Sequence, residues 1–263
     1  KTILMSNDCC NTNQSDRSLK DLDQKDAIQY RYGSAALEKE TCLCTPVGFD
    51  PVLLEAIPDE IIDRDYGCGD PTKYVRKNDI VLDLGSGSGK NAFICSQIVG
   101  KQGKVIGVDQ NSDMLFLSRS AIKHVSEKIG FANTEFLEGS IEKIDELDDK
   151  SNPLIKDSSV DIILSNCVLN LVNPQSRYNL LRNIKRVLKK DGRIAISDIV
   201  SNKKVPLRLQ NDNDLWTGCL SGAWYEPDFL NDFKELGFKN LKFAERSNEP
   251  WKVIEDIEFR TVT

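Results

Sequence analysis

Four cysteines that lie far apart in the sequence are the residues best able to do chemistry in this chain. They are Cys44, Cys68, Cys167 and Cys219, and they accompany a glycine-rich loop in a chain of 263 residues with one histidine. Sulfur ligands suit a soft electrophile or a metalloid, whereas the shortage of histidine disfavours a reaction that removes a proton from oxygen or nitrogen. The residue types therefore predict thiol chemistry beside a nucleotide cofactor.

The glycine-rich loop spans Asp83–Lys90 and reads Asp-Leu-Gly-Ser-Gly-Ser-Gly-Lys, between a strand pattern and a helix pattern. Its glycines allow a tight turn and a close approach of the backbone to a ligand. Two phosphate-binding motifs fit it poorly. A P-loop needs one more residue before Gly89-Lys, and a dinucleotide fingerprint needs glycine at Lys90. ATP is therefore disfavoured, and NAD is a second choice.

Two acidic residues favour a cofactor that carries a cation and a ribose. Asp83 stands directly before the glycines, where it would repel a pyrophosphate but can pair with an ammonium group. Asp109 ends the next strand pattern, about twenty residues on, where a carboxylate can accept both ribose hydroxyls.

The segment Asp-x-Gly-x-Gly-x-Gly followed by Asp109 resembles the S-adenosylmethionine site of class I methyltransferases. The resemblance implies contacts to the amino-acid part, the ribose, the adenine and the methionine part of that cofactor. In this order they are Gly85 and Gly87, Asp109 and Gln110, Met114 with Ser140 and Ile141, and Asn166.

The chain alternates strand and helix patterns, which predicts an α/β fold with a doubly wound, mostly parallel sheet of the Rossmann-like class I type. The expected strands are 80–84, 104–109, 135–137, 160–165 and 193–198, followed by 241–244 and 259–262. We expect an N-terminal arm and helix over 1–45, a cofactor-binding methyltransferase domain over 46–200 and a smaller substrate lobe over 201–263.

Cys167 follows a strand pattern, so it is expected at the carboxyl edge of the sheet, where open α/β sheets bind ligands. Cys68, Cys44 and Cys219 lie in loops that must fold over this edge to reach the same pocket. Any one of these cysteines also fits a small buried hydrophobic residue, as Cys95 does within a helix pattern. Structural zinc is disfavoured, because Cys-x-x-Cys spacing is absent.

Three motifs around these cysteines closely resemble the S-adenosylmethionine-dependent arsenite methyltransferases. They are Tyr66-Gly-Cys-Gly-Asp-Pro, Ser165-Asn-Cys-Val-Leu-Asn-Leu and Gly218-Cys-Leu-Ser-Gly-Ala, and Arg31-Tyr-Gly and Ile257-Glu-Phe-Arg agree with the same family. The resemblance covers nearly the whole chain.

This resemblance implies that Cys167 and Cys219 bind arsenic(III), with Cys68 as a third ligand or redox partner and Tyr66 beside the sulfonium group. It also implies that Cys44 and Cys68 form a disulfide relay, which a thioredoxin-like protein or a glutathione-type thiol resets. Cys42 could take the place of Cys44. The vicinal pair formed by Cys9 and the next residue could capture arsenic or belong to a tail without a role.

Composition limits the other partners. The formal net charge of −6 gives no positive field for nucleic acid. No apolar run is long enough for a membrane span or a secretory signal, so we expect a cytoplasmic protein with reduced thiols. His124 lies within a helix pattern and is expected on the surface.

The predicted function is transfer of a methyl group from S-adenosylmethionine to thiolate-bound trivalent arsenic, a detoxification reaction that requires no general base. Two alternatives stay open: a methyltransferase for a small organic substrate, and a non-catalytic metalloid-binding protein. Substitution of the cysteines by serine distinguishes the first, and turnover of the cofactor distinguishes the second.

Overall fold

The computed structural model describes residues 19–43 and 47–263, with nothing given for the side chain of Cys42. The predictions for Cys9, Cys10 and Cys44 concern residues outside this described part.

One sheet organises the described residues, with its strands in the order β3-β2-β1-β4-β5-β8-β7 and β6 beside β5. The strands β1 to β5 run parallel, β8 is antiparallel to β5, and β7 is antiparallel to β8. The predicted doubly wound, mostly parallel sheet is confirmed. The strand bounds are β1 Ile80–Leu84, β2 Lys104–Asp109, β3 Thr134–Glu138, β4 Val160–Asn166, β5 Leu188–Ser201, β6 Trp224–Tyr225, β7 Lys252–Ile254 and β8 Ile257–Val262.

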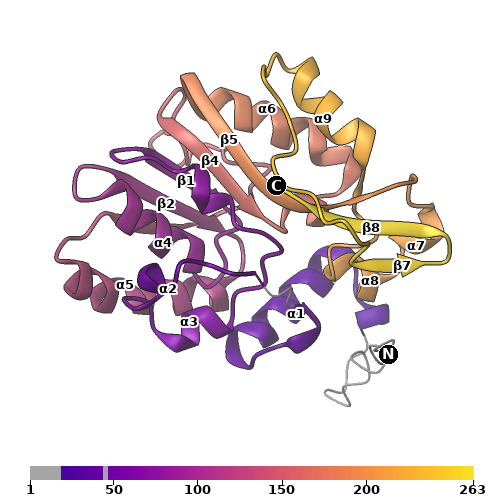
Figure 1. Cartoon of the computed structure of the whole chain (residues 1–263), viewed down its shortest axis with the longest axis horizontal. Coiled ribbons are helices and arrows are strands. Elements are labelled where there is room, and N and C mark those ends of the chain that lie inside the picture. Colours follow the sequence, from indigo (N-terminus) through magenta and orange to yellow (C-terminus); the bar gives the residue numbers. More distant parts are fainter. Residues whose placement is uncertain (1–18, 44–46) are drawn as a thin grey trace.

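Helices cover both faces of the sheet, with α4 and α5 on one side and α6 and α9 on the other (Figure 1). Strands covered on both faces need apolar side chains in both directions, and this explains why the residues of β1 other than Asp83 are apolar. The α-helices are α1 Gln24–Leu37, α2 Pro51–Leu54, α3 Asp59–Asp63, α4 Lys90–Val99, α5 Ser112–Ile129, α6 Arg177–Val187, α7 Leu207–Gln210, α8 Asn213–Thr217 and α9 Glu226–Glu235.

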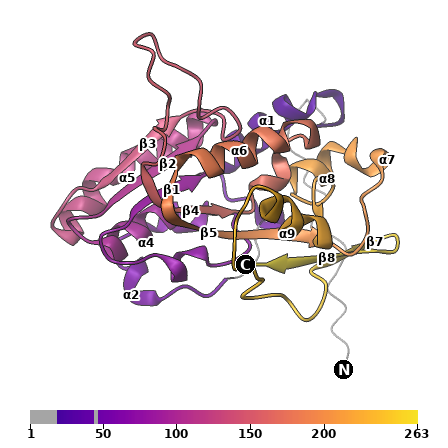
Figure 2. The ribbon, with the colours of Figure 1, turned by 90° about the horizontal axis from the view of Figure 1, so that it is seen from above.

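The expected strand at 241–244 is wrong, because these residues form no strand. Their alternating exposure comes from a loop that lies on α9, where Phe243 stacks on Phe229 with ring centroids 6.1 Å apart. The strand nearest in sequence is β7, which pairs with β8. Residues after 200 therefore extend the main sheet as well as adding helices beside it (Figure 2).

The helix α1 packs against α5 and α8, which are both distant from it in the sequence (Figure 1). Its first turn is capped by Asp23, whose carboxylate accepts a hydrogen bond of 2.9 Å from the backbone N–H of Asp26. This packing places α1 over the end of the sheet where the predicted site residues lie.

Candidate functional site

A cavity that is partly open to solvent lies between the ends of β1, β2 and β4 and the inner side of α1. This is the edge at which open α/β sheets bind ligands. Most of the cofactor residues predicted from the sequence line it: Gly85, Gly87, Asp109, Gln110, Met114, Ser140, Ile141 and Asn166. Asp83 is not among the lining residues.

The glycine loop is held in a conformation that requires glycine. Gly85 and Gly87 have φ values of 68° and 50°, in the left-handed region that residues with a Cβ rarely adopt. A Cβ at Gly85 would also lie 2.4 Å from the side chain of Val168. The backbone N–H groups of Gly85 and Ser86 both donate to the carbonyl of Val108, which fixes the loop on β2.

Asp109 is held rigidly at the cavity wall. One carboxylate oxygen accepts the N–H of Gly87 and the other accepts the N–H of Asn111, each at 2.8 Å. Burial raises the pKa of Asp109, and the hydrogen bonds from Asn111, Gly87 and Gln110 oppose this shift. Each oxygen keeps a second lone pair, so the carboxylate can still accept ribose hydroxyls.

Asp83 lies behind the loop and is 1% exposed. Burial, followed by the nearby charges of Asp65 and Asp109, raises its pKa to about 7, and its Oδ2 has no hydrogen-bond partner among the described residues. The acidic residue that faces the cavity on this side is Asp65, which forms an ion pair with Lys90.

The cavity lining fits a ligand such as S-adenosylmethionine. Two polar atoms of lining residues, Ser86 Oγ and Asn91 Oδ1, are buried without a partner among the described residues, although buried polar atoms are normally hydrogen-bonded. They suit the polar end of an amino acid. Met114 and Ile141 supply apolar surface for a flat base, and Asp109 supplies the ribose acceptor between these regions.

The structure brings three of the predicted thiols together. Cys68, Cys167 and Cys219 are free, buried and packed in one apolar cluster. The Cys219 thiol donates a hydrogen bond of 2.9 Å to the carbonyl of Cys167. Cys167 also lines the cofactor cavity, so it belongs to both parts of the site.

All three thiols are held in their neutral form. The hydrogen bond with Cys167 and then burial raise the pKa of Cys219 well above its ordinary value, and burial raises the pKa of Cys68. For Cys167, the hydrogen bond with Cys219 favours ionisation, but the hydrogen bond with Cys68 and burial outweigh it, and the pKa is well above normal. Within residues 19–43 and 47–263, no group of three His, Cys, Asp or Glu side chains has the geometry of a metal-ion site.

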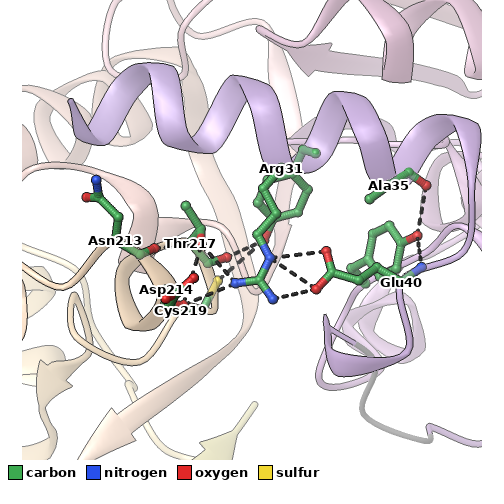
Figure 3. Close-up of polar contacts among 9 residues, drawn as sticks. Arg31, Ala35, Glu40, Asn213, Asp214, Thr217 and Cys219 are labelled. Carbon is green, nitrogen blue, oxygen red and sulfur yellow. Dashed lines mark hydrogen bonds and ion pairs between the residues drawn. The ribbon is translucent and has the colours of Figure 1, made fainter. Parts of the chain in front are cut away.

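A polar network anchors the turn before Cys219 to α1 (Figure 3). Arg31 forms an ion pair of 2.5 Å with Glu40 and donates to the Asp214 carbonyl at 3.1 Å and to the Thr217 hydroxyl at 2.8 Å. Since α8 ends at Thr217, the network fixes the start of the Cys219 turn.

Tyr32 is a site residue that the sequence analysis did not single out, except within the motif Arg31-Tyr-Gly. Its hydroxyl donates to the Thr217 carbonyl at 3.2 Å and lies 3.9 Å from the Cys219 sulfur, and the residue lines the cavity. Burial raises the pKa of Tyr32 well above normal, so its hydroxyl stays protonated.

Tyr66 lines the cavity with its hydroxyl already engaged. The hydroxyl donates to the Ala35 carbonyl at 2.8 Å and accepts the N–H of Glu40 at 3.0 Å (Figure 3). These bonds leave the ring of Tyr66 as the part available to a ligand, and the ring of Tyr32 meets it edge-on at 6.3 Å.

Residues expected to have no role in the reaction lie away from the cavity. His124 is exposed on α5, and Cys95 is fully buried in α4. No helix in the described part of the chain is long and apolar enough to cross a membrane.

Comparison with known proteins gives one consistent result. A family model described as a methyltransferase domain matches residues 75–248. The chain is similar to three arsenite methyltransferases. The one from Aquipseudomonas alcaligenes is 33% identical over 84% of this chain and 63% of the relative. The one from Mus musculus is 35% identical over 80% and 57%, and the one from Homo sapiens is 33% identical over 84% and 60%. The chain thus spans about 60% of the length of these relatives.

Among solved structures, the chain is similar to an arsenic(III) S-adenosylmethionine methyltransferase from Chlamydomonas reinhardtii. The TM-score is 0.72 and the identity 28%, over 83% of this chain and 73% of that chain. The resemblance to arsenite methyltransferases inferred from the cysteine motifs is therefore confirmed.

Proposed function

We propose that this chain, which belongs to the methyltransferase domain family and has the class I fold, transfers the methyl group of S-adenosylmethionine to trivalent arsenic. The observation that carries the proposal is the position of Cys167. Cys167 lines the cofactor cavity and is packed in one buried cluster with Cys68 and Cys219, so one residue joins the two halves of the reaction.

S-adenosylmethionine, when bound, supplies an electrophilic methyl group on a sulfonium. Asp109 would hold its ribose, and Ser86 and Asn91 would meet its amino-acid part. The rings of Tyr32 and Tyr66 line the same cavity and offer aromatic faces to a cation.

The three thiols would hold arsenic as a pyramid. Each buried thiol replaces a hydroxyl or thiol group on arsenic, and the thiol proton leaves with the displaced group. Arsenic(III) keeps its lone pair in this geometry, so it is itself the nucleophile. The site needs no general base, and orientation in the crevice supplies much of the rate.

The product step requires a reductant. Methyl transfer raises arsenic formally from the trivalent to the pentavalent state. Arsenic would be reduced when a second thiol attacks the sulfur of an arsenic-bound cysteine: the S–S bond forms, the As–S bond breaks with its electron pair left on arsenic, and the attacking thiol releases its proton. We assign Cys68 to this pair, with Cys44 as its partner by family resemblance. A thioredoxin-like protein or a glutathione-type thiol would then reduce the disulfide.

The test is an assay of the reduced chain with arsenite, a thiol reductant and methyl-labelled S-adenosylmethionine, with separation of the arsenic products. Wild-type chain should label arsenic, and Cys167→Ser should abolish the label. Cys95→Ser is the matched control, because Cys95 is an equally buried free thiol in α4, outside the thiol cluster.

Two results would reject the proposal. Label on an organic acceptor that Cys167→Ser retains would assign the chain to small-molecule methylation. Tight binding of arsenite without any transfer of label, despite intact cofactor binding, would assign it to metalloid binding without catalysis.

A further inference from the structure

Cys167 and Cys219 both adopt a backbone conformation that residues other than glycine rarely take. Their φ values are both 62°, in the left-handed region. Such a conformation costs free energy and persists only where the surrounding contacts enforce it. The contacts that hold these two turns therefore decide where the two thiols point.

Asn170 connects the turn that follows Cys167 with the turn that contains Cys219. It is fully buried, and its Nδ2 donates to the carbonyl of Ile199 at 2.7 Å and to the carbonyl of Cys219 at 3.1 Å. In the opposite direction, the Cys219 thiol donates to the carbonyl of Cys167 at 2.9 Å. Each strained turn is thus held by a group from the other.

Asn166 makes the corresponding connection to the loop of Cys68. Its Oδ1 accepts the N–H of Cys68 at 2.8 Å and the N–H of Gly69 at 3.2 Å, and its Nδ2 donates to the Gly69 carbonyl at 2.8 Å. Asn166 immediately precedes Cys167, so two asparagines on either side of this cysteine reach the two other thiol-bearing loops.

Glycines in these loops allow the close approach. A Cβ at Gly67 would lie 2.2 Å from the side-chain nitrogen of Asn166, and a Cβ at Gly222 would lie 1.9 Å from the carbonyl oxygen of Asn170. No side chain other than hydrogen fits at either place without a shift of the turn. A side chain at position 67 or 222 would therefore displace the asparagines that hold the thiol-bearing loops.

The amide of Asn170 is retained at a cost to stability. Its Oδ1 is buried without a hydrogen-bond partner among the described residues. An unpaired buried polar atom destabilises the fold, so an apolar residue of similar size would avoid this penalty. What an apolar residue could not supply is the Nδ2 donor, which bonds to the carbonyls of Ile199 and Cys219, and the second of these bonds reaches the turn that carries a thiol.

We propose that Asn166 and Asn170 are positioning residues that set the arrangement of the three thiols, and that Asn170 controls the affinity for trivalent arsenicals through the Cys219 turn. The inference takes its ligand from the proposed function, but the thiol geometry itself does not depend on methyl transfer.

The experiment compares Asn170→Leu with Asn133→Leu in the full chain. Asn133 is the matched control, because its Nδ2 also donates to two backbone carbonyls, those of Ser96 and Gly100 at 3.1 and 2.9 Å, at the opposite edge of the sheet. The ligand probe is phenylarsine oxide, a trivalent arsenical that bridges two thiols. N-ethylmaleimide labelling of each cysteine, followed by mass spectrometry, reports thiol exposure.

Asn170→Leu should bind phenylarsine oxide about tenfold more weakly and should label at Cys219 about tenfold faster than wild type, because a buried hydrogen bond that holds the turn is lost. Affinity for S-adenosylhomocysteine should stay unchanged. Asn133→Leu should change neither thiol property.

Wild-type arsenical affinity and labelling in Asn170→Leu would overturn the inference, as would equal losses in Asn133→Leu. If circular dichroism shows that Asn170→Leu does not fold, Asn170→Ser withdraws the same donor with a smaller change, and the same two measurements decide. If wild type methylates no arsenic, the proposed function fails, while the labelling comparison still decides the role of Asn170.

Discussion

Trivalent arsenic should bind to this chain with almost no net exchange of protons near neutral pH. The prediction follows from the neutral state of the thiols at Cys68, Cys167 and Cys219, whose pKa values are all raised. Burial raises the pKa of Cys68, and hydrogen bonding within the cluster together with burial gives Cys167 and Cys219 pKa values well above normal. Arsenous acid is also neutral at this pH. Three thiols therefore replace three hydroxyl groups on arsenic, and every thiol proton departs in a molecule of water.

The number of protons taken up per arsenic distinguishes binding by neutral thiols from binding by preformed thiolates. A thiol with an ordinary pKa of about 8.5 is about 10% ionised at pH 7.5, so three such thiols would take up about 0.3 proton per arsenic. The raised pKa values place the expected uptake below that figure. Fully ionised thiols would instead require the uptake of about three protons, one for each water released.

Isothermal titration calorimetry measures this number directly. Arsenite is titrated into the reduced chain at pH 7.5, without cofactor, in buffers that differ in ionisation enthalpy. The slope of the observed enthalpy against the buffer enthalpy gives the protons exchanged per arsenic. Glutathione, an unburied thiol, is the reference titration.

A slope near zero is expected for the protein. An uptake of one proton or more per arsenic would refute the reasoning, because at least one of the three thiols would then be ionised before arsenic arrives. The same experiment at pH 6.5 should give the same slope, since neutral thiols lose no further charge on acidification.

Three further predictions concern the elements that support the site. Asp109→Asn should weaken the binding of S-adenosylhomocysteine about tenfold in calorimetry, because an amide cannot accept both the backbone N–H groups and the ribose; unchanged affinity would remove Asp109 from the ribose site. Gly85→Ala should lower the free energy of unfolding more than Gly87→Ala in denaturant titrations, since both incur a left-handed strain of about 1–2 kcal/mol but only the first also meets a neighbouring side chain; equal losses would contradict this. Arg31→Gln should speed amide hydrogen exchange in α1 and α8 about tenfold, because the ion pair with Glu40 and the bonds to α8 are lost; wild-type protection in α8 would contradict it.

The elements of the central sheet were predictable because their signals are local. The strands at 80–84 and 104–109 have the predicted bounds, since apolar periodicity acts over a few neighbours. The segment 241–244 alternates like a strand although it is a loop, because Phe243 packs on Phe229 of α9.

The cofactor residues were predictable to the extent that a loop motif specifies its own backbone. The left-handed conformation of Gly85 and Gly87 could be predicted from the sequence, because glycine is the usual residue in that conformation. The position of Asp83 was not readable in the same way. Its sequence neighbours identify a carboxylate next to the loop, but only the packing shows that Asp83 is buried away from the cavity and that Asp65 lines it.

The arrangement of the thiols depends on contacts that no sequence period encodes. Cys167 and Cys219 adopt the left-handed conformation without being glycine or asparagine, so nothing in their type announces a strained turn. Asn170 reaches Cys219 across 49 positions, and Tyr32 reaches Thr217 across 185. Family resemblance identified the cysteines. The residues that position them are identified only by hydrogen bonds between side chains and backbone carbonyls in the folded chain.

The strained turns have a physical consequence for how arsenic can be held. A thiol on a freely rotating loop loses conformational entropy when it binds a ligand, and this loss weakens binding. In this chain hydrogen bonds fix the Cys167 and Cys219 turns without a ligand, from the Asn170 amide, from the Cys219 thiol and through the anchoring of Thr217 to α1. Part of the conformational entropy of these turns is therefore lost on folding and not on ligand binding. Because Cys167 also forms the cavity wall, any shift of its turn alters the cofactor site and the thiol cluster together.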